Sequence, residues 1–138
     1  MALTLIDVEI RSGDVDLDVV QAGETITNGE AVYRSTDSLY YLADNNTSTV
    51  TAEAVGVAVT EADAAEDYFV LLTVGTVMLT STTLAVGTTY CLGSTPGSIE
   101  TYAEVTSGGS TDYVTVLGVG VSTSELELAV NATGAFKA

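Results

Sequence analysis

The sequence predicts an all-β protein with a compact β-sandwich or β-barrel architecture. Almost every patterned segment alternates apolar and polar residues with a period of two, and Val, Thr, Tyr, Leu and Ile fill these segments. Only 61–66 has helical character, and it is too short for more than one helical turn. Strands are expected at about 3–10, 15–20, 30–35, 38–43, 53–60, 67–73, 76–80, 88–92, 98–103, 113–121 and 125–130.

Turn signals separate these strands in order along the chain. Gly, Asn, Asp, Ser and Pro dominate the signals because these residues adopt or preset the backbone angles of tight turns. Strands this short and this regularly spaced are typical of a sandwich or barrel. The signals are Ser12-Gly13-Asp14, Ala22-Gly23-Glu24, Asn28-Gly29, Asp44-Asn45-Asn46, Val86-Gly87, Pro96-Gly97 and Ser107-Gly108-Gly109-Ser110.

Two parts of the sequence resemble each other. This internal similarity suggests two similar β-units, 23–80 and 81–130, that share one core. The alternative is that short hairpins with glycine turns resemble one another by default. Gly56 and Gly120 lie inside strand patterns and are expected to mark a bulge, a bend or the close approach of another backbone. The matching segments are 29–33 with 87–90, 39–41 with 99–102, and 55–60 with 117–122.

The two ends are expected to be attachments to a β-domain that spans 23–130. Residues 1–22 form either an N-terminal arm that pairs with a neighbouring chain or ordinary first strands. Residues 131–138 are small and loosely patterned and are expected to form a C-terminal tail. The start of the chain lacks the pattern of a signal peptide, which fits synthesis in a cytoplasm.

Charge excludes several classes of function. The 138 residues contain three basic and nineteen acidic side chains and no histidine, so the formal net charge is −16. Such a surface repels phosphate backbones and anionic lipid, so neither nucleic acid nor a membrane is expected as a partner. The missing histidine removes the commonest general base and metal ligand. We therefore expect no enzymatic activity and no cofactor. The acidity suggests a saline (halophilic) setting that screens the repulsion, and the alternatives are a protein that is merely very soluble or one whose carboxylates face a basic partner.

Two acidic clusters could carry chemistry. Asp14, Asp16 and Asp18 share one face of a strand and are weak candidates for a metal site, but the spacing lacks the glycine and glutamate of an EF-hand. A solvated face with Val15, Leu17 and Val19 turned inward is the preferred interpretation, and an ion at a subunit contact is the alternative. The second cluster, Glu61, Asp63, Glu66 and Asp67, could serve a glycosidase, but an exposed acidic loop is preferred.

Tyrosine is the residue most suggestive of binding, since seven tyrosines outnumber two phenylalanines. A tyrosine buries a large ring while its hydroxyl finds a partner, which makes the residue common at interfaces. Cys91 has no cationic neighbour in the sequence and is expected to be a buried, inert thiol. The interface candidates are Arg11, Tyr33, Tyr40, Tyr41 and Tyr102.

Residues 21–33, 39–44 and 54–58 contain, in order, an Ala-Gly turn followed by Gly-Glu-Ala-Val-Tyr, a Leu-Tyr-Tyr hairpin and a Val-Gly-Val strand. This order resembles the capsid decoration, or cement, proteins of tailed bacterial or archaeal viruses, over about residues 20–122. The resemblance implies a homotrimer on the outer surface of a virion, where it binds the major capsid protein and stabilises the shell. The extreme acidity and the second β-unit leave a head-fibre, turret or tail-fibre component involved in host attachment as the alternative.

Overall fold

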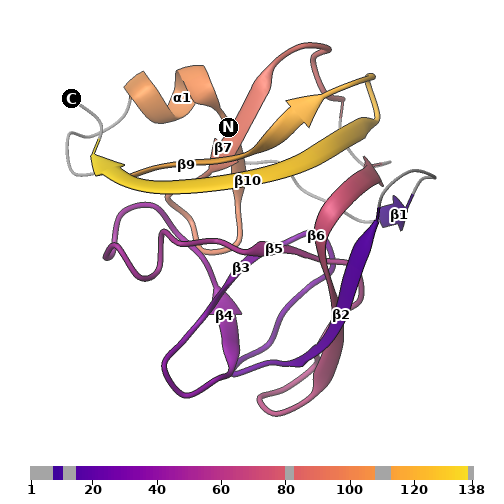
Figure 1. Ribbon diagram of the computed structural model, residues 1–138, viewed down its shortest axis with the longest axis vertical. Coiled ribbons are helices and arrows are strands. Elements are labelled where there is room, and N and C mark those ends of the chain that lie inside the picture. Colours follow the sequence, from indigo (N-terminus) through magenta and orange to yellow (C-terminus); the bar gives the residue numbers. More distant parts are fainter. Residues whose placement is uncertain (1–7, 11–14, 80–82, 108–112, 137–138) are drawn as a thin grey trace.

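The structure, a computed structural model, describes residues 8–10, 15–79, 83–107 and 113–136. These residues form an antiparallel sheet that curls into a half-barrel, together with one short helix, which confirms the all-β prediction (Figure 1). The elements are β1 (Val8–Ile10), β2 (Asp16–Gln21), β3 (Ala31–Arg34), β4 (Tyr40–Leu42), β5 (Gly56–Ala58), β6 (Tyr68–Leu79), β7 (Thr89–Leu92), β8 (Ile99–Thr101), α1 (Tyr102–Ser107), β9 (Tyr113–Gly120) and β10 (Glu125–Phe136).

Two successive groups of four strands have the same pairing order. In the first group β3 pairs with β4 and β5, and β5 pairs with β6. In the second group β7 pairs with β8 and β9, and β9 pairs with β10. The internal similarity of the sequence therefore corresponds to two β-units of the same topology. In Figure 1 the first unit occupies the lower part of the view and the second unit the upper part.

Glycines at equivalent positions allow the third and fourth strands of each unit to approach closely. A Cβ atom on Gly56 would collide with the carbonyl oxygen of Leu72, and a Cβ atom on Gly118 would collide with the carbonyl oxygen of Glu127. A Cβ atom on Gly120 would also meet backbone, in the loop that precedes β7. The expectation that Gly56 and Gly120 mark the close approach of another backbone is confirmed.

β6 is the strand that the two units share. It pairs with β5 at Leu71 and Leu72 and with β10 from Val74 to Met78. Its opposite edge carries β2 along the first half and β1 along the second half. The separate strands expected at 67–73 and 76–80 are thus one strand, because Gly75 continues the extended chain at a φ of 140° instead of ending it.

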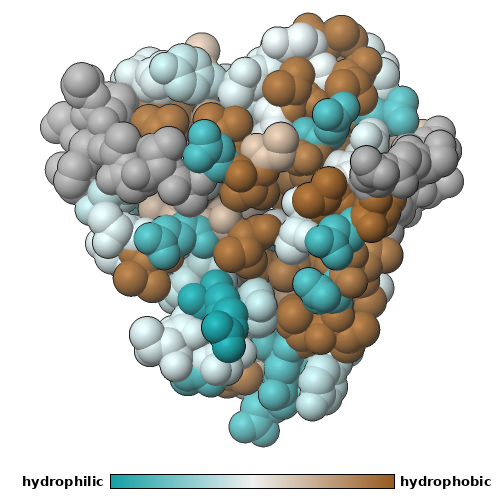
Figure 2. Space-filling view, in the orientation of Figure 1, coloured by the Kyte–Doolittle hydropathy of each residue, from teal (hydrophilic) through white to brown (hydrophobic). Residues whose placement is uncertain are grey.

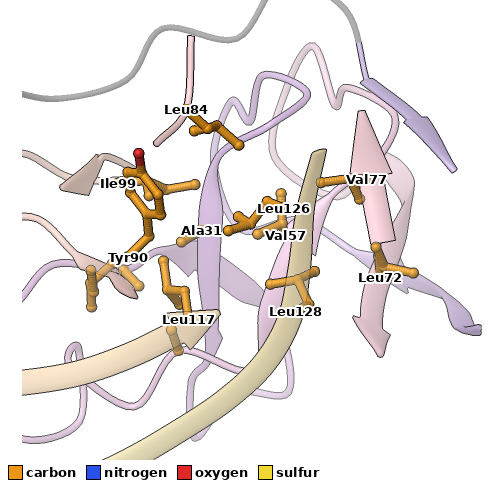
Figure 3. Packing of buried hydrophobic residues seen from close by; sticks show 13 residues of the cluster. Ala31, Val57, Leu72, Val77, Leu84, Tyr90, Ile99, Leu117, Leu126 and Leu128 are labelled. Carbon is orange, nitrogen blue, oxygen red and sulfur yellow. The ribbon is translucent and has the colours of Figure 1, made fainter. Parts of the chain in front are cut away.

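Two hydrophobic cores lie on opposite faces of the first unit. Leu71 and Leu72 belong to different cores because successive side chains of a strand point to opposite faces. The main core draws residues from both units, and Figure 3 shows these side chains converging on a common interior. It contains Ala31, Ala43, Ala54, Val57, Leu72, Val77, Leu84, Tyr90, Leu92, Ile99, Leu117, Leu126 and Leu128. The smaller core contains Ala22, Ile26, Val32, Ala58, Ala62, Phe69 and Leu71.

The loop after β4 ties the first unit to the second through Asn45, which is 1% exposed. Its backbone N–H donates to the carbonyl of Gly93 at 3.1 Å, and its side-chain amide donates to the carbonyl of Leu92 at 3.0 Å. Its own carbonyl accepts from the N–H of Tyr113 at 2.7 Å. These bonds connect the β4–β5 loop to β7 and β9, so the two units form one folded body.

The helix lies where the sequence predicted a strand. The strand expected at 98–103 ends at Thr101, and α1 begins at Tyr102, whereas 61–66 is a turn with no helix. Thr101 and Glu104 form a capping box: the Glu104 N–H donates to Thr101 Oγ1, and the Thr101 N–H donates to Glu104 Oε1, both at 3.1 Å. The Thr-x-x-Glu spacing was the sequence signal for this helix. It was missed because residues 98–103 also alternate with a period of two, which predicts a strand.

Thr101→Ala is expected to lower the free energy of unfolding by about 1 kcal/mol, since the helix loses the hydroxyl that caps it. Urea denaturation followed by tyrosine fluorescence measures this loss. Thr101→Ser keeps the hydroxyl and is the matched control, expected to remain near wild type. Equal destabilisation by both substitutions would contradict the capping role.

The C-terminal boundary differs from the expected one. β10 continues through Phe136 and pairs with β9 at Asn131 and Ala132. Residues 131–136 are therefore part of the sheet and do not form the separate tail expected from their small side chains. The reason is that ladder hydrogen bonds use only the backbone, so a weak side-chain pattern does not prevent pairing.

Candidate association surface

An exposed apolar surface lies over β2 and β6. Leu17 and Val19 of β2 are 43% and 72% exposed, and Tyr68 and Val74 of β6 are 67% and 45% exposed. We call Leu17, Val19 and Tyr68, which share one side of the two strands, the β2–β6 face. Figure 2 shows hydrophobic residues gathered on the side of the molecule where Figure 1 places β2 and β6. Apolar surface of this kind, on so acidic a chain, is a candidate for association with another molecule.

The pairing register explains how these side chains come together. Val19 lies opposite Val70, and Gln21 lies opposite Tyr68, in the antiparallel β2–β6 ladder. Directly paired residues of an antiparallel ladder point to the same face, and alternate residues of one strand share a face. Leu17, Val19 and Tyr68 therefore lie on one side of the two strands, continuous with Leu72, which the main core covers. Val74 pairs with Asp16 beyond a register shift and lies on the other side.

The burial predicted for one face of β2 is wrong. Val15, Leu17 and Val19 were expected to face inward, but they are 38%, 43% and 72% exposed. Instead Val20 packs against the smaller core. Alternation determines which residues share a face, but burial depends on what covers that face, and the main core ends at β6 before it reaches β2.

The weak metal candidates are not brought together with further ligands. Asp16 and Asp18 are exposed on β2, and Asp14 lies outside the described residues. Among the residues that the structure describes, no group of three or more Asp, Glu or Cys side chains has a metal-binding arrangement. Asp16 and Asp18 instead place negative charge along β2, which pairs with β6 on one of its edges.

The predicted interface tyrosines occupy three different environments. Tyr33 and Tyr41 stack with ring centroids 6.0 Å apart, and Gly23 leaves the space that the Tyr41 ring fills. Tyr40 makes an edge-to-face contact with the buried Phe69, with ring centroids 6.3 Å apart, so its ring packs against the smaller core. Tyr102, at the start of α1, is 49% exposed. Arg11 lies outside the described residues.

Tyr41 also acts on a carboxylate. Its hydroxyl donates to Asp37 Oδ2 at 2.6 Å, and the N–H of Leu39 donates to Asp37 Oδ1 at 2.9 Å. The bond from Tyr41, followed by the bond from Leu39, lowers the pKa of Asp37, and the same Tyr41–Asp37 bond raises the pKa of Tyr41. A folded-state pKa below the unfolded value means that this pair stabilises the protein above the unfolded pKa and ceases to do so as the pH falls through the folded pKa.

Tyr41→Phe is therefore expected to raise the pKa of Asp37 towards its ordinary value and to weaken the acid-dependent loss of stability. A ¹³C NMR titration of the Asp37 carboxyl group measures this change directly. Tyr33→Phe is the control, since Tyr33 stacks on Tyr41 but makes no hydrogen bond with Asp37 in the described contacts. An Asp37 titration that is identical in wild type and Tyr41→Phe would contradict the assignment.

The remaining reactive side chains do not converge on a site. Glu61, Asp63, Glu66 and Asp67 are all exposed in the turn that precedes β6. Cys91 is buried in β7, and burial raises the pKa of its thiol to about 11, so the reactive thiolate is scarce at neutral pH.

The β2–β6 face is the feature that sequence reasoning missed. Tyr68 belongs to the run Tyr-Phe-Val-Leu-Leu-Thr-Val, whose apolar residues do not alternate. A strand without alternation has apolar side chains on both faces, and this was the available signal that β6 carries two apolar surfaces. Which parts of them stay exposed depends on the neighbouring unit.

Comparison with known proteins identifies no relative: no protein-family model matches the chain, and no curated protein matches its sequence. In the part of the chain that the structure describes, no helix is both long enough and apolar enough to cross a membrane.

Proposed function

We propose that this protein is a structural, non-catalytic virion protein that binds the outer surface of a viral capsid and stabilises the shell. It acts as a homotrimer whose partner is the major capsid protein, and the virion surface is its location. The observation that carries this proposal is the β2–β6 face, an exposed apolar surface on a chain with a formal net charge of −16.

The chemistry of the surface supports binding. The three exposed side chains of the β2–β6 face include an aromatic ring, and burying aliphatic and aromatic area gives most of the free energy of protein association. The formal charge of −16 opposes association with acidic partners and favours a basic shell surface or a saline medium. The resemblance of residues 20–122 to capsid decoration proteins selects the shell among such partners.

The reactive groups support a role without catalysis. The carboxylates of 61–67 point into solvent from a turn, and the Cys91 thiol is buried with a raised pKa. A catalytic acid or nucleophile instead lies in a cleft that shifts its pKa towards the working pH. We expect neither glycan nor peptide turnover, and any turnover that Glu66→Gln or Asp67→Asn abolishes would overturn this part of the proposal.

The decisive experiment mixes the purified protein with undecorated capsids of tailed viruses and measures co-sedimentation. The expected result is saturable binding at a fixed ratio of trimers to shell sites and a higher temperature of shell rupture. Native mass spectrometry of the free protein tests the trimer. Binding to host cells without binding to shells would favour the fibre or turret alternative and reject decoration.

A further inference from the structure

Among the described residues, the outer edge of β2 is unpaired at Leu17 and Val19, whereas just past the strand Ala22 forms a parallel bridge with Tyr40 of β4. The N–H of Ala22 donates to Asp67 at 2.8 Å and its carbonyl accepts from Glu66 at 2.7 Å, so the peptide groups of Ala22 face β6. Peptide groups of successive residues in a strand point to opposite edges. Leu17 and Val19 therefore direct their N–H and C=O groups away from β6, where no strand of the described chain pairs with them.

The second unit shows what occupies the equivalent edge. Ala58 pairs with Leu71 and Gly120 pairs with Leu126, so Leu71 and Leu126 hold the same place in their units. Asp18 of β2 lies opposite Leu71, and Val77 of β6 lies opposite Leu126. The second half of β6 therefore occupies the same place beside β10 that β2 occupies beside β6.

β1 lies antiparallel along the outer edge of that second half of β6, with Ile10 opposite Val77. An added antiparallel strand is therefore compatible with this architecture, and none of the described residues supplies one at that place in the first unit. The unpaired stretch at Leu17 and Val19 is the position in the first unit that corresponds to the edge bound by β1.

The side chains of β2 specify the chemistry of such a strand. Leu17 and Val19 are exposed on one face, and Asp18 is exposed on the other. A neighbouring strand places its own side chains beside both sets, which favours aliphatic residues on one face and cationic residues on the other. A second copy of β2 would instead place Asp16 and Asp18 beside the same carboxylates, in a chain whose net charge is −16.

On the basis of the function proposed above, we propose that β2 takes up an extended segment of the shell protein, in which aliphatic residues alternate with Lys or Arg, as an added antiparallel β-strand. The backbone groups of Leu17 and Val19 supply the ladder hydrogen bonds. The β2–β6 face contacts the aliphatic side chains, and Asp16 and Asp18 pair with the cationic ones.

A short peptide of alternating Lys and Val, acetylated and amidated, is the probe, and fluorescence anisotropy measures its Kd for the full-length protein. Val19→Pro removes an outward-facing N–H and should weaken binding about tenfold or more, a loss of roughly 1.4 kcal/mol. Val19→Ala keeps that N–H and should weaken binding only a few-fold. Thermal unfolding of both variants verifies that they are folded.

The control peptide alternates Glu and Val, and it is expected not to bind. The double variant Asp16→Asn, Asp18→Asn should bind the Lys–Val peptide more weakly and with a smaller dependence on salt. NMR amide shifts caused by the Lys–Val peptide should centre on Leu17 and Val19. Equal binding of both peptides, or equal binding by wild type and folded Val19→Pro, would overturn the strand-addition proposal.

Capsid binding separates this inference from the proposed function. If Val19→Pro binds undecorated capsids as tightly as wild type does, the strand addition is wrong and the decoration role stands. If wild type binds the peptide but no capsid, the proposed function fails while the edge site is retained. If Val19→Pro dissociates the oligomer and leaves peptide binding unchanged, the edge belongs to a second copy and the inference is overturned.

Discussion

Gly56→Ala and Gly118→Ala are each expected to lower the free energy of unfolding by about 3 kcal/mol. In both cases the new methyl group would collide with the carbonyl oxygen of a paired neighbouring strand, at Leu72 and Glu127 respectively. Backbone held in a ladder cannot move aside without breaking hydrogen bonds, so the cost lies at the upper end of that for overpacking a core. Urea denaturation followed by circular dichroism measures the loss.

Gly87→Ala is the matched control for this pair. Gly87 has a φ of 79°, but nothing lies within 4 Å of the position of its Cβ atom. Its substitution therefore introduces only the strain of the left-handed conformation, about 1–2 kcal/mol. If Gly56→Ala or Gly118→Ala costs no more than Gly87→Ala, the strands do not approach as closely as the structure indicates. A large effect at only one of them would contradict the equivalence of the two units.

Leu72→Ala is expected to cost about 2–5 kcal/mol, whereas Leu17→Ala is expected to cost less than about 1 kcal/mol. The two residues are directly paired across the β2–β6 ladder, yet Leu72 is fully buried in the main core and Leu17 is 43% exposed. Removal of the Leu72 side chain leaves a cavity that the two units cannot close, whereas solvent replaces the side chain of Leu17.

This pair also tests the burial of β2. Burial of Leu17 in the core, as alternation predicted, would make Leu17→Ala about as costly as Leu72→Ala. Thermal unfolding of the two variants under identical conditions distinguishes a buried Leu17 from an exposed one. Equal destabilisation would show that another part of the protein or another molecule covers β2.

The extent to which sequence predicted this fold differs from element to element. Alternation and turn residues located β2, β3, β4 and β7 to within one or two residues, since these are short strands whose local pattern is complete. The same pattern failed at Thr101–Glu104, where a capping box of two residues overrode strand propensity. It also divided β6 at Gly75, because glycine is read as a breaker unless the pairing on both edges is known.

The candidate surface was less predictable than the fold. Tyrosines were expected to mark it, but Tyr40 packs inside on Phe69, and Tyr33 and Tyr41 stack on each other. The tyrosine of the β2–β6 face is Tyr68, and its position on that face follows from its pairing with Gln21. No local property of a tyrosine indicates whether its ring meets the chain or the solvent.

The sequence alone determined the all-β class, the acidic character and the absence of histidine, because these depend on composition and on local pattern. Only the tertiary structure decided that β6 joins two units, that Gly56 and Gly118 meet the carbonyl groups of distant strands, that the main core ends before β2, and that Leu17 and Val19 are exposed. Burial is a property of what lies across the sheet, and a pattern with a period of two states which side chains are together without stating which side is covered.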